Sequence, residues 1–229
     1  MEATEIKTPA TFVQFLFYRL DPAWRHLPDE QRQCRTSELA ETIESAAGIT
    51  TYAYNTTGLK AGTDLLLWRH GPDTADLQSS AAAIHRTTLG KYLEIAQSYF
   101  GLIRPSVYTR RQTPQEQSIF AQERGTYLVV YPFTKTIDWY FLSKATRQGM
   151  MNEHIKTGHE YPNIKQVLVH STGLDDQEFM VAYETEDLLE FKTLVIDLRS
   201  SDARRHTLSD TPIYTCVNRP LREALELLA

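Results

Sequence analysis

The sequence predicts an α+β fold built from two similar halves, each with the element order β-α-β-β-α-β. Short runs of alternating or aromatic-rich residues, which are typical of strands, occur between longer runs with helical periodicity. This order occurs once in residues 1–108 and again in residues 127–229. Between them, residues 109–126 are polar, rich in glutamine and without periodicity, which is typical of a linker or a flap.

The first half contains four predicted strands and two predicted helices. Thr36 or Ser37 can cap a helix by accepting hydrogen bonds from its first N–H groups, and Gly48 can end it. Asp73 begins the second helix, whose apolar residues recur on one face. The expected strands are 12–20, 50–55, 64–69 and one within 99–108, and the expected helices are 36–48 and one from 73 that includes Leu77, Ala81 and Ile84.

The second half repeats this order. Ser143 is a suitable N-cap for a helix that ends near Lys156, and residues 187–199 show an amphipathic helical pattern. A unit of this order is the split βαβ, or ferredoxin-like, motif. Two such units can join their sheets into one barrel with helices outside, which protects the sheet edges. The expected strands are 127–133, 165–171, 178–183 and 213–217.

The composition is that of an ordinary globular protein, with 23% charged and 41% hydrophobic residues. A net charge of −5 disfavours a nucleic-acid partner, and the longest apolar runs are strand-sized, too short to span a membrane. Cys34 and Cys216 lie outside any metal-binding spacing, so we expect reduced thiols and neither zinc nor an iron–sulfur cluster. The N-terminus shows no signal-peptide pattern, and cytoplasmic localisation is expected.

A series of motifs spans the second half. Its parts, in order, are Tyr-Pro-Phe-Thr-Lys at 131–135, Trp139, a Met-Met-Asn-Glu-His run ending at His154, Gln166, and His-Ser-Thr-Gly-Leu-Asp-Asp at 170–176. This series resembles the chlorite dismutase superfamily of haem proteins, strongly over residues 127–216 and more weakly over 64–108. The resemblance implies a closed α+β barrel with helices outside, haem as the cofactor, and rings of five subunits.

The resemblance assigns His154, expected at the end of a helix, as the axial ligand of the haem iron, a role that suits a neutral imidazole nitrogen. Taken alone, such a histidine is more often a surface residue favoured by the helix dipole. The family gives this imidazole a glutamate acceptor; the matching residue is Asp202, one methylene shorter, and the alternative is an exposed loop aspartate. Trp139 matches a tryptophan beside the porphyrin, or is a core aromatic.

Position 166 separates the chemistries of the superfamily. Chlorite-detoxifying members have an arginine there, whose charge can hold an anionic oxidant, whereas Gln166 is neutral. Some coproheme decarboxylases have glutamine at this position. In them a tyrosine that matches Tyr131 lies beside a haem propionate and takes part in its oxidative decarboxylation. Without the resemblance, Gln166 would be a half-buried strand residue and Tyr131 a core tyrosine with a satisfied hydroxyl.

Two cations near these motifs suit an acidic ligand. Lys135 is a compact partner for a propionate carboxylate and a candidate for proton transfer, although any one lysine is more often solvated. Arg204 stands where some decarboxylases have a propionate-binding serine, and an arginine can bind a carboxylate bidentately. The loop between Lys135 and Trp139 is shorter than in most decarboxylases, and Phe179 stands in place of a second tryptophan.

The resemblance therefore implies an enzyme that converts iron coproporphyrin III to protohaem with hydrogen peroxide. The alternatives are a chlorite dismutase-like or peroxidase-like oxidoreductase, a haem carrier or sensor without turnover, and a barrel that has lost haem binding. The catalytic residues it implies are Tyr131, Gln166 and Lys135. The haem-binding residues it implies are His154, which also ligates the iron, Lys135, Trp139, Arg204 and Asp202.

Overall fold

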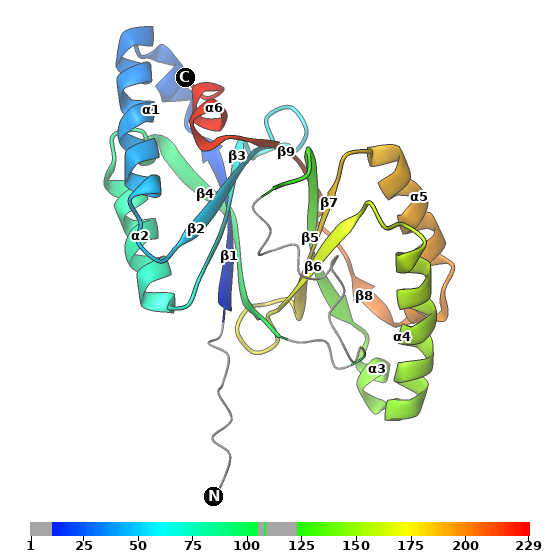
Figure 1. Cartoon of the computed structure of the whole chain (residues 1–229). Coiled ribbons are helices and arrows are strands. Elements are labelled where there is room, and N and C mark those ends of the chain that lie inside the picture. The colour runs from blue at the N-terminus through cyan, green and yellow to red at the C-terminus, as the bar shows by residue number, and fades with distance from the viewer. Residues whose placement is uncertain (1–10, 105–107, 109–122) are drawn as a thin grey trace, which may run out of the picture.

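A computed structural model describes residues 11–104, 108 and 123–229, and shows one nine-stranded sheet with helices outside it (Figure 1). The elements of the first half are β1 (Thr11–Leu20), η1 (Pro22–His26), α1 (Asp29–Glu44), β2 (Thr50–Asn55), β3 (Leu65–Gly71), α2 (Thr74–Arg86), η2 (Gly90–Tyr92) and β4 (Leu93–Ile103). Those of the second half are β5 (Tyr127–Lys135), α3 (Ile137–Phe141), α4 (Lys144–His159), β6 (Lys165–His170), β7 (Phe179–Thr185), α5 (Leu188–Arg199), η4 (Asp202–His206), β8 (Thr207–Ser209), β9 (Tyr214–Arg219) and α6 (Leu221–Glu226).

Helix α1 begins earlier than the sequence predicted. Its first residue is Asp29, preceded by Pro28, so the expected cap at Thr36 lies inside the helix. The hydroxyl of Thr36 donates to the carbonyl of Gln33 at 2.7 Å instead of accepting from an N–H group. A serine or threonine can bond back to its own helix in this way, which is why the expected start was wrong.

Strand β4 also differs from the prediction. It was expected within 99–108, but it begins at Leu93 because it pairs with β1 from Leu20↔Leu93 to Thr11↔Ile103. Helices α3 and α6 were not expected at all. Most of the expected linker at 109–126 lies outside the described residues, which resume at Glu123.

The two halves close on each other to form a barrel. The strand order is β4-β1-β3-β2 in the first half and β9-β5-β7-β6 in the second, which is the same order of equivalent strands. Antiparallel pairing of β2 with β9 and of β4 with β6 then joins both edges. The predicted α+β barrel of two ferredoxin-like halves is confirmed. Short β8 extends the sheet beside the end of β5.

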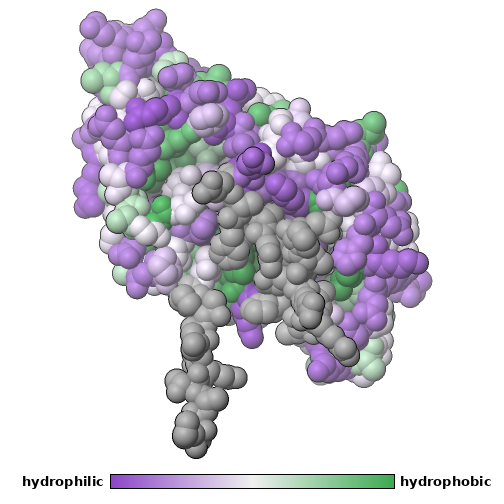
Figure 2. Space-filling view, in the orientation of Figure 1, coloured by the Kyte–Doolittle hydropathy of each residue, from purple (hydrophilic) through white to green (hydrophobic). Residues whose placement is uncertain are grey.

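Buried side chains form three layers. The barrel interior is filled by residues from both halves, including Phe15, Trp68 and Val130. A second layer lies between the first-half sheet and helices α1, α2 and α6, which cover it on the outside (Figure 1). The third layer, under α4 and α5, is much smaller. Its fully buried members are Ile164, Tyr183 and Leu194. Hydrophilic side chains cover most of the outer surface of the helices (Figure 2).

Candidate functional site

The strands of the second half turn one face to the barrel interior and the other to α4 and α5. Val130, Val167 and Ala182 belong to the interior core. Because successive side chains of a strand alternate between faces, their neighbours lie on the outer face. This outer face carries Tyr131, Phe133, Lys135, Gln166, Leu168, His170, Phe179, Val181 and Tyr183.

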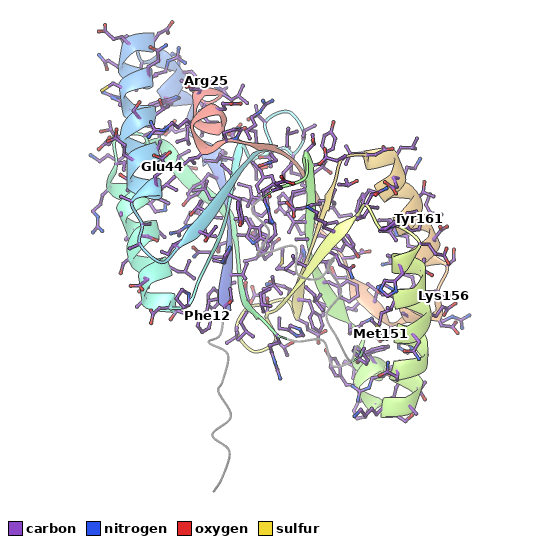
Figure 3. All side chains as sticks on the ribbon, in the orientation of Figure 1. Phe12, Arg25, Glu44, Met151, Lys156 and Tyr161 are labelled. Carbon is purple, nitrogen blue, oxygen red and sulfur yellow. The ribbon has the colours of Figure 1, made fainter. Side chains whose placement is uncertain are left out.

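Few of the described side chains between this face and α4 are fully buried. Leu168 is 45% exposed although it lies on the helix-facing side of β6. None of the residues of α4, all of which the structure describes, is buried. Met151 lies on the side of α4 turned toward the sheet, and Lys156 points outward (Figure 3). The described side chains of this helix–sheet layer are therefore less deeply buried than those of the first half.

His154 lies on α4 and is half-buried. The expectation that it ends the helix was wrong, because α4 continues to His159 and the helix dipole therefore does not explain its position. Burial, with a smaller contribution from the nearby Lys135 ammonium, lowers the pKa of His154 to about 4. The imidazole is thus neutral at physiological pH, which is the form that can ligate a metal.

Lys135 and Trp139 lie together at the end of β5. The Nζ atom of Lys135 is 4.2 Å from the centroid of the Trp139 ring, and Trp139 itself is buried. Burial lowers the pKa of Lys135 to about 8, an effect that Glu178 opposes. Glu178 also accepts the backbone N–H of Lys135 at 2.7 Å, which fixes this strand end. Lys135 therefore combines a positive charge with a pKa close to neutrality, as a proton donor requires.

Tyr131 lies four residues before Lys135 on the same face of β5. Its ring centroid is 6.2 Å from that of Tyr183, with 28° between the ring planes, so the two rings stack. Burial raises the pKa of Tyr131 well above its ordinary value, with a further contribution from Tyr183 and from the charge of Asp210. The phenol is therefore neutral and carries its proton at Oη at any pH in which the protein works.

Gln166 lies on β6 directly opposite Tyr183 of β7. It is half-buried and shares the outer face with Tyr131. Tyr131 and Gln166 thus lie on the same face of the sheet, and Tyr183, which pairs with Gln166, stacks its ring on that of Tyr131. This face is opposite α4, the helix that carries His154.

Arg204 and Asp202 differ in their burial and in their ion-pair partners. Arg204 is half-buried, and its Nη1 lies 2.5 Å from Oδ2 of Asp210, the residue whose charge reaches Tyr131. Asp202 is exposed, and its carboxylate lies 3.4 Å from Nε of Arg205. Among the described residues, Asp202 and His154 share no hydrogen bond or ion pair. Asp202 as the partner of the axial histidine therefore remains a prediction from the resemblance.

Three residues at this site were missed from the sequence. Tyr183 contacts Tyr131, Asp210 pairs with Arg204, and Glu178 holds the backbone of Lys135. The alternation along 178–183 could have placed Tyr183 on the outer face, but not beside Tyr131. The contacts of Asp210 and Glu178 depend on strand pairing and chain reversal, for which a single sequence carries no local signal.

Comparison with known proteins shows the family. The chlorite dismutase family model matches residues 20–219, and the chain belongs to this family. It is 34% identical over 163 residues to a coproheme decarboxylase from Mycolicibacterium smegmatis, covering 71% of this chain and 70% of that protein. It is 31% identical over 205 residues to a coproheme decarboxylase from Staphylococcus carnosus, covering 80% and 82%.

A solved structure supports the same assignment. A mutant chlorite dismutase from Candidatus Nitrospira defluvii superposes with a TM-score of 0.87 at 28% identity, covering 100% of both chains. Coproheme decarboxylases and chlorite dismutases are families of haem proteins, so the comparisons support a haem-related function. Among the described residues, no helix is both long and apolar enough to cross a membrane.

Proposed function

We propose that this chain binds iron coproporphyrin III between α4 and the outer face of the second-half sheet. It would convert two of the propionates to vinyl groups, with each carboxylate leaving as carbon dioxide and hydrogen peroxide as the two-electron oxidant for each. The observation that carries the proposal is that Tyr131 and neutral Gln166 lie on the same face of one sheet, opposite the helix of His154. Similarity to two coproheme decarboxylases supports the same activity.

The residues present fit a haem group. His154 offers a neutral, half-buried imidazole, the donor that haem iron takes from many proteins. Trp139 and Phe133 offer aromatic surface for a flat macrocycle. Lys135 and Arg204 offer positive charge for its carboxylates, although Arg204 would have to share its guanidinium with Asp210. When bound, the haem iron supplies the oxidising chemistry with peroxide.

The chain's own residues would divide the remaining tasks. Tyr131 holds a hydrogen atom at Oη that it can lose under oxidation and recover from a propionate side chain. Lys135 can hold or release a proton at Nζ near pH 8. Gln166 can donate a hydrogen bond without adding charge, so it does not hold an anionic oxidant as an arginine would.

The test is to load the metal-free protein with iron coproporphyrin III under anaerobic conditions, titrate with hydrogen peroxide, and follow the porphyrin mass. We expect two successive losses, each of one carbon dioxide and two hydrogens. Tyr131→Phe should abolish this loss while leaving porphyrin binding intact. Tyr127→Phe, on the same face of β5, is the matched control and should retain activity. A porphyrin mass that never changes in the wild type would refute the proposal.

A second candidate is a chlorite dismutase-like activity, which the structural similarity to chlorite dismutase favours. It predicts rapid oxygen release from chlorite by the haem-loaded protein. We expect little release because Gln166 carries no positive charge. Gln166→Arg should then raise the rate of oxygen release, and a fast wild-type rate would make this candidate the better one.

A further inference from the structure

Two arginines and one aspartate form a cluster in the segment that follows α5. Nη1 of Arg204 donates a hydrogen bond to Oδ2 of Asp210 at 2.5 Å, and Nη2 of Arg199 lies 3.7 Å from the same oxygen. Arg199 ends α5, Arg204 lies in η4, and Asp210 follows β8. The cluster joins two positive charges to one negative charge, so it stays positive overall.

Strand pairing places this cluster beside the proposed site. Strand β5 pairs with β8 at one end and with β9 at the other, so the segment that joins β8 to β9 runs beside Tyr131 of β5. Asp210 begins this segment. Burial, with smaller contributions that include the charge of Asp210, raises the pKa of Tyr131, in agreement with this placement. Arg204 lies in η4, which ends at His206, whose ring centroid is 5.6 Å from that of Trp139.

The bond to Asp210 occupies only one part of the Arg204 guanidinium. An arginine has five N–H groups in a rigid planar fork, and it keeps its charge in proteins. Asp210 takes Nη1, whereas Nε and Nη2 of Arg204 have no hydrogen-bond partner among the described residues. Two parallel N–H groups on one edge of the fork match the two oxygens of a carboxylate. The side chain of Arg204 is 37% exposed, so a ligand can reach this edge.

We propose that Asp210 is a positioning residue for Arg204: by binding Nη1 it holds the guanidinium in one orientation, with the Nε–Nη2 edge available to one carboxylate of the porphyrin. The inference rests on the proposed function, in which Arg204 binds a carboxylate. An arginine side chain that is not held samples many rotamers, and ordering it when a ligand binds lowers the affinity. Arg199 supplies the positive charge that offsets Asp210 near an anionic ligand.

Two substitutions separate the hydrogen bond from the charge. Asp210→Asn and Asp210→Ala both remove the negative charge, but only asparagine keeps an oxygen that can accept from Nη1. We expect the alanine variant of the haem-free protein to bind iron coproporphyrin III roughly two- to fivefold more weakly than the asparagine variant, the range for one partly exposed pair. A Soret titration measures both Kd values. Asp176→Asn and Asp176→Ala, at an exposed aspartate between β6 and β7, are the matched control and should bind equally.

Two further measurements exclude a merely structural role. With iron coproporphyrin tetramethyl ester, which has no carboxylates, both Asp210 variants should have the same Kd. They should also have the same Kd for iron coproporphyrin III when Arg204 is replaced by alanine, because the residue that Asp210 positions is then absent. A loosened segment would weaken binding in both experiments, and this result would overturn the positioning role.

A crystal structure of the wild type with iron coproporphyrin III needs no variant. We expect Nη1 of Arg204 to stay on Asp210 while Nε and Nη2 donate to one porphyrin carboxylate. Displacement of Asp210 by the carboxylate, or no carboxylate at Arg204, overturns the proposal, as do equal Kd values for the two Asp210 variants. A wild type that binds the porphyrin but never releases carbon dioxide refutes only the proposed activity, because the binding measurements still decide the role of Asp210. A wild type that binds no iron coproporphyrin III refutes both.

Discussion

The two halves share one element order and one strand order, yet they fill their helix–sheet layers differently. Helices α1 and α4 are equivalent and each has 16 residues; α1 buries four of them, whereas α4 buries none. Among the described residues, sixteen buried hydrophobic residues form the layer of the first half, and three form that of the second. Protein interiors are normally close-packed, so the low burial under α4 and α5 favours this layer as the proposed place for a ligand.

The same contrast appears on the strands. On the helix-facing side of β3 in the first half, Leu65 and Leu67 are fully buried. The helix-facing side of β6 carries Gln166, Leu168 and His170, and none of these three is buried. The first half therefore contributes more buried packing to stability. The second half has the proposed functional side chains at positions where the first half has buried core residues. The predictions below test this division.

The largest expected effect is on haem binding. His154→Ala should remove the Soret band that appears when haemin is added to the haem-free protein, because the proposed ligand of the iron is lost. Affinity should fall by more than the roughly 10–100-fold that loss of an outer ligand partner costs. His159→Ala, an exposed histidine on the same helix, is the control and should bind normally. If both variants bound haemin equally well, α4 would not be part of the haem site.

A pair of leucine substitutions tests the division of packing directly. In the metal-free protein, Leu67→Ala should lower the free energy of unfolding by about 2–5 kcal/mol, because a fully buried side chain leaves a cavity. Leu168→Ala, on the equivalent face of the second half, should cost less than about 1 kcal/mol, because Leu168 is already 45% exposed. Urea unfolding measures both, and similar losses would contradict the contrast between the halves.

The pH dependence of stability should have a contribution from the first half. Burial lowers the pKa of His70 from 6.5 to about 4, with help from Arg124. Between these values the unfolded chain binds a proton that the folded protein does not, so stability falls as the pH drops from 6.5 to 4. His70→Gln should flatten this fall by on the order of 1–3 kcal/mol. An unchanged slope in urea unfolding across this window would show that His70 is not the group responsible.

The smallest expected effect concerns Asp202. Because its carboxylate is exposed and lies near Arg205, Asp202→Asn should change stability by less than about 0.5 kcal/mol. The position of the Soret band of the haem-loaded protein should also stay the same. A shifted band, or faster haem loss, would show instead that Asp202 reaches His154 when haem is bound, as the resemblance implies.

Local patterns determined much of the fold. The caps at Asp73, Ser143 and Asp187 accept hydrogen bonds from N–H groups two or three residues ahead, so their helices could be placed from the sequence. Alternation along β5, β6 and β7 likewise placed most of the second-half strands. The start of α1 was missed because the hydroxyl of Thr36 can either cap a helix or bond back within one.

The description of the candidate site depended both on the sequence motifs and on the tertiary structure. The sequence by itself, through its resemblance to the family, proposed the side chains for the chemistry, Tyr131, Lys135, His154 and Gln166, because the motifs fix their identity and spacing. Only the tertiary structure decided that the Tyr183 ring meets that of Tyr131, that Asp210 pairs with Arg204, and that no residue of α4 is buried. These contacts join residues far apart in the chain through strand register and packing, which no local pattern specifies.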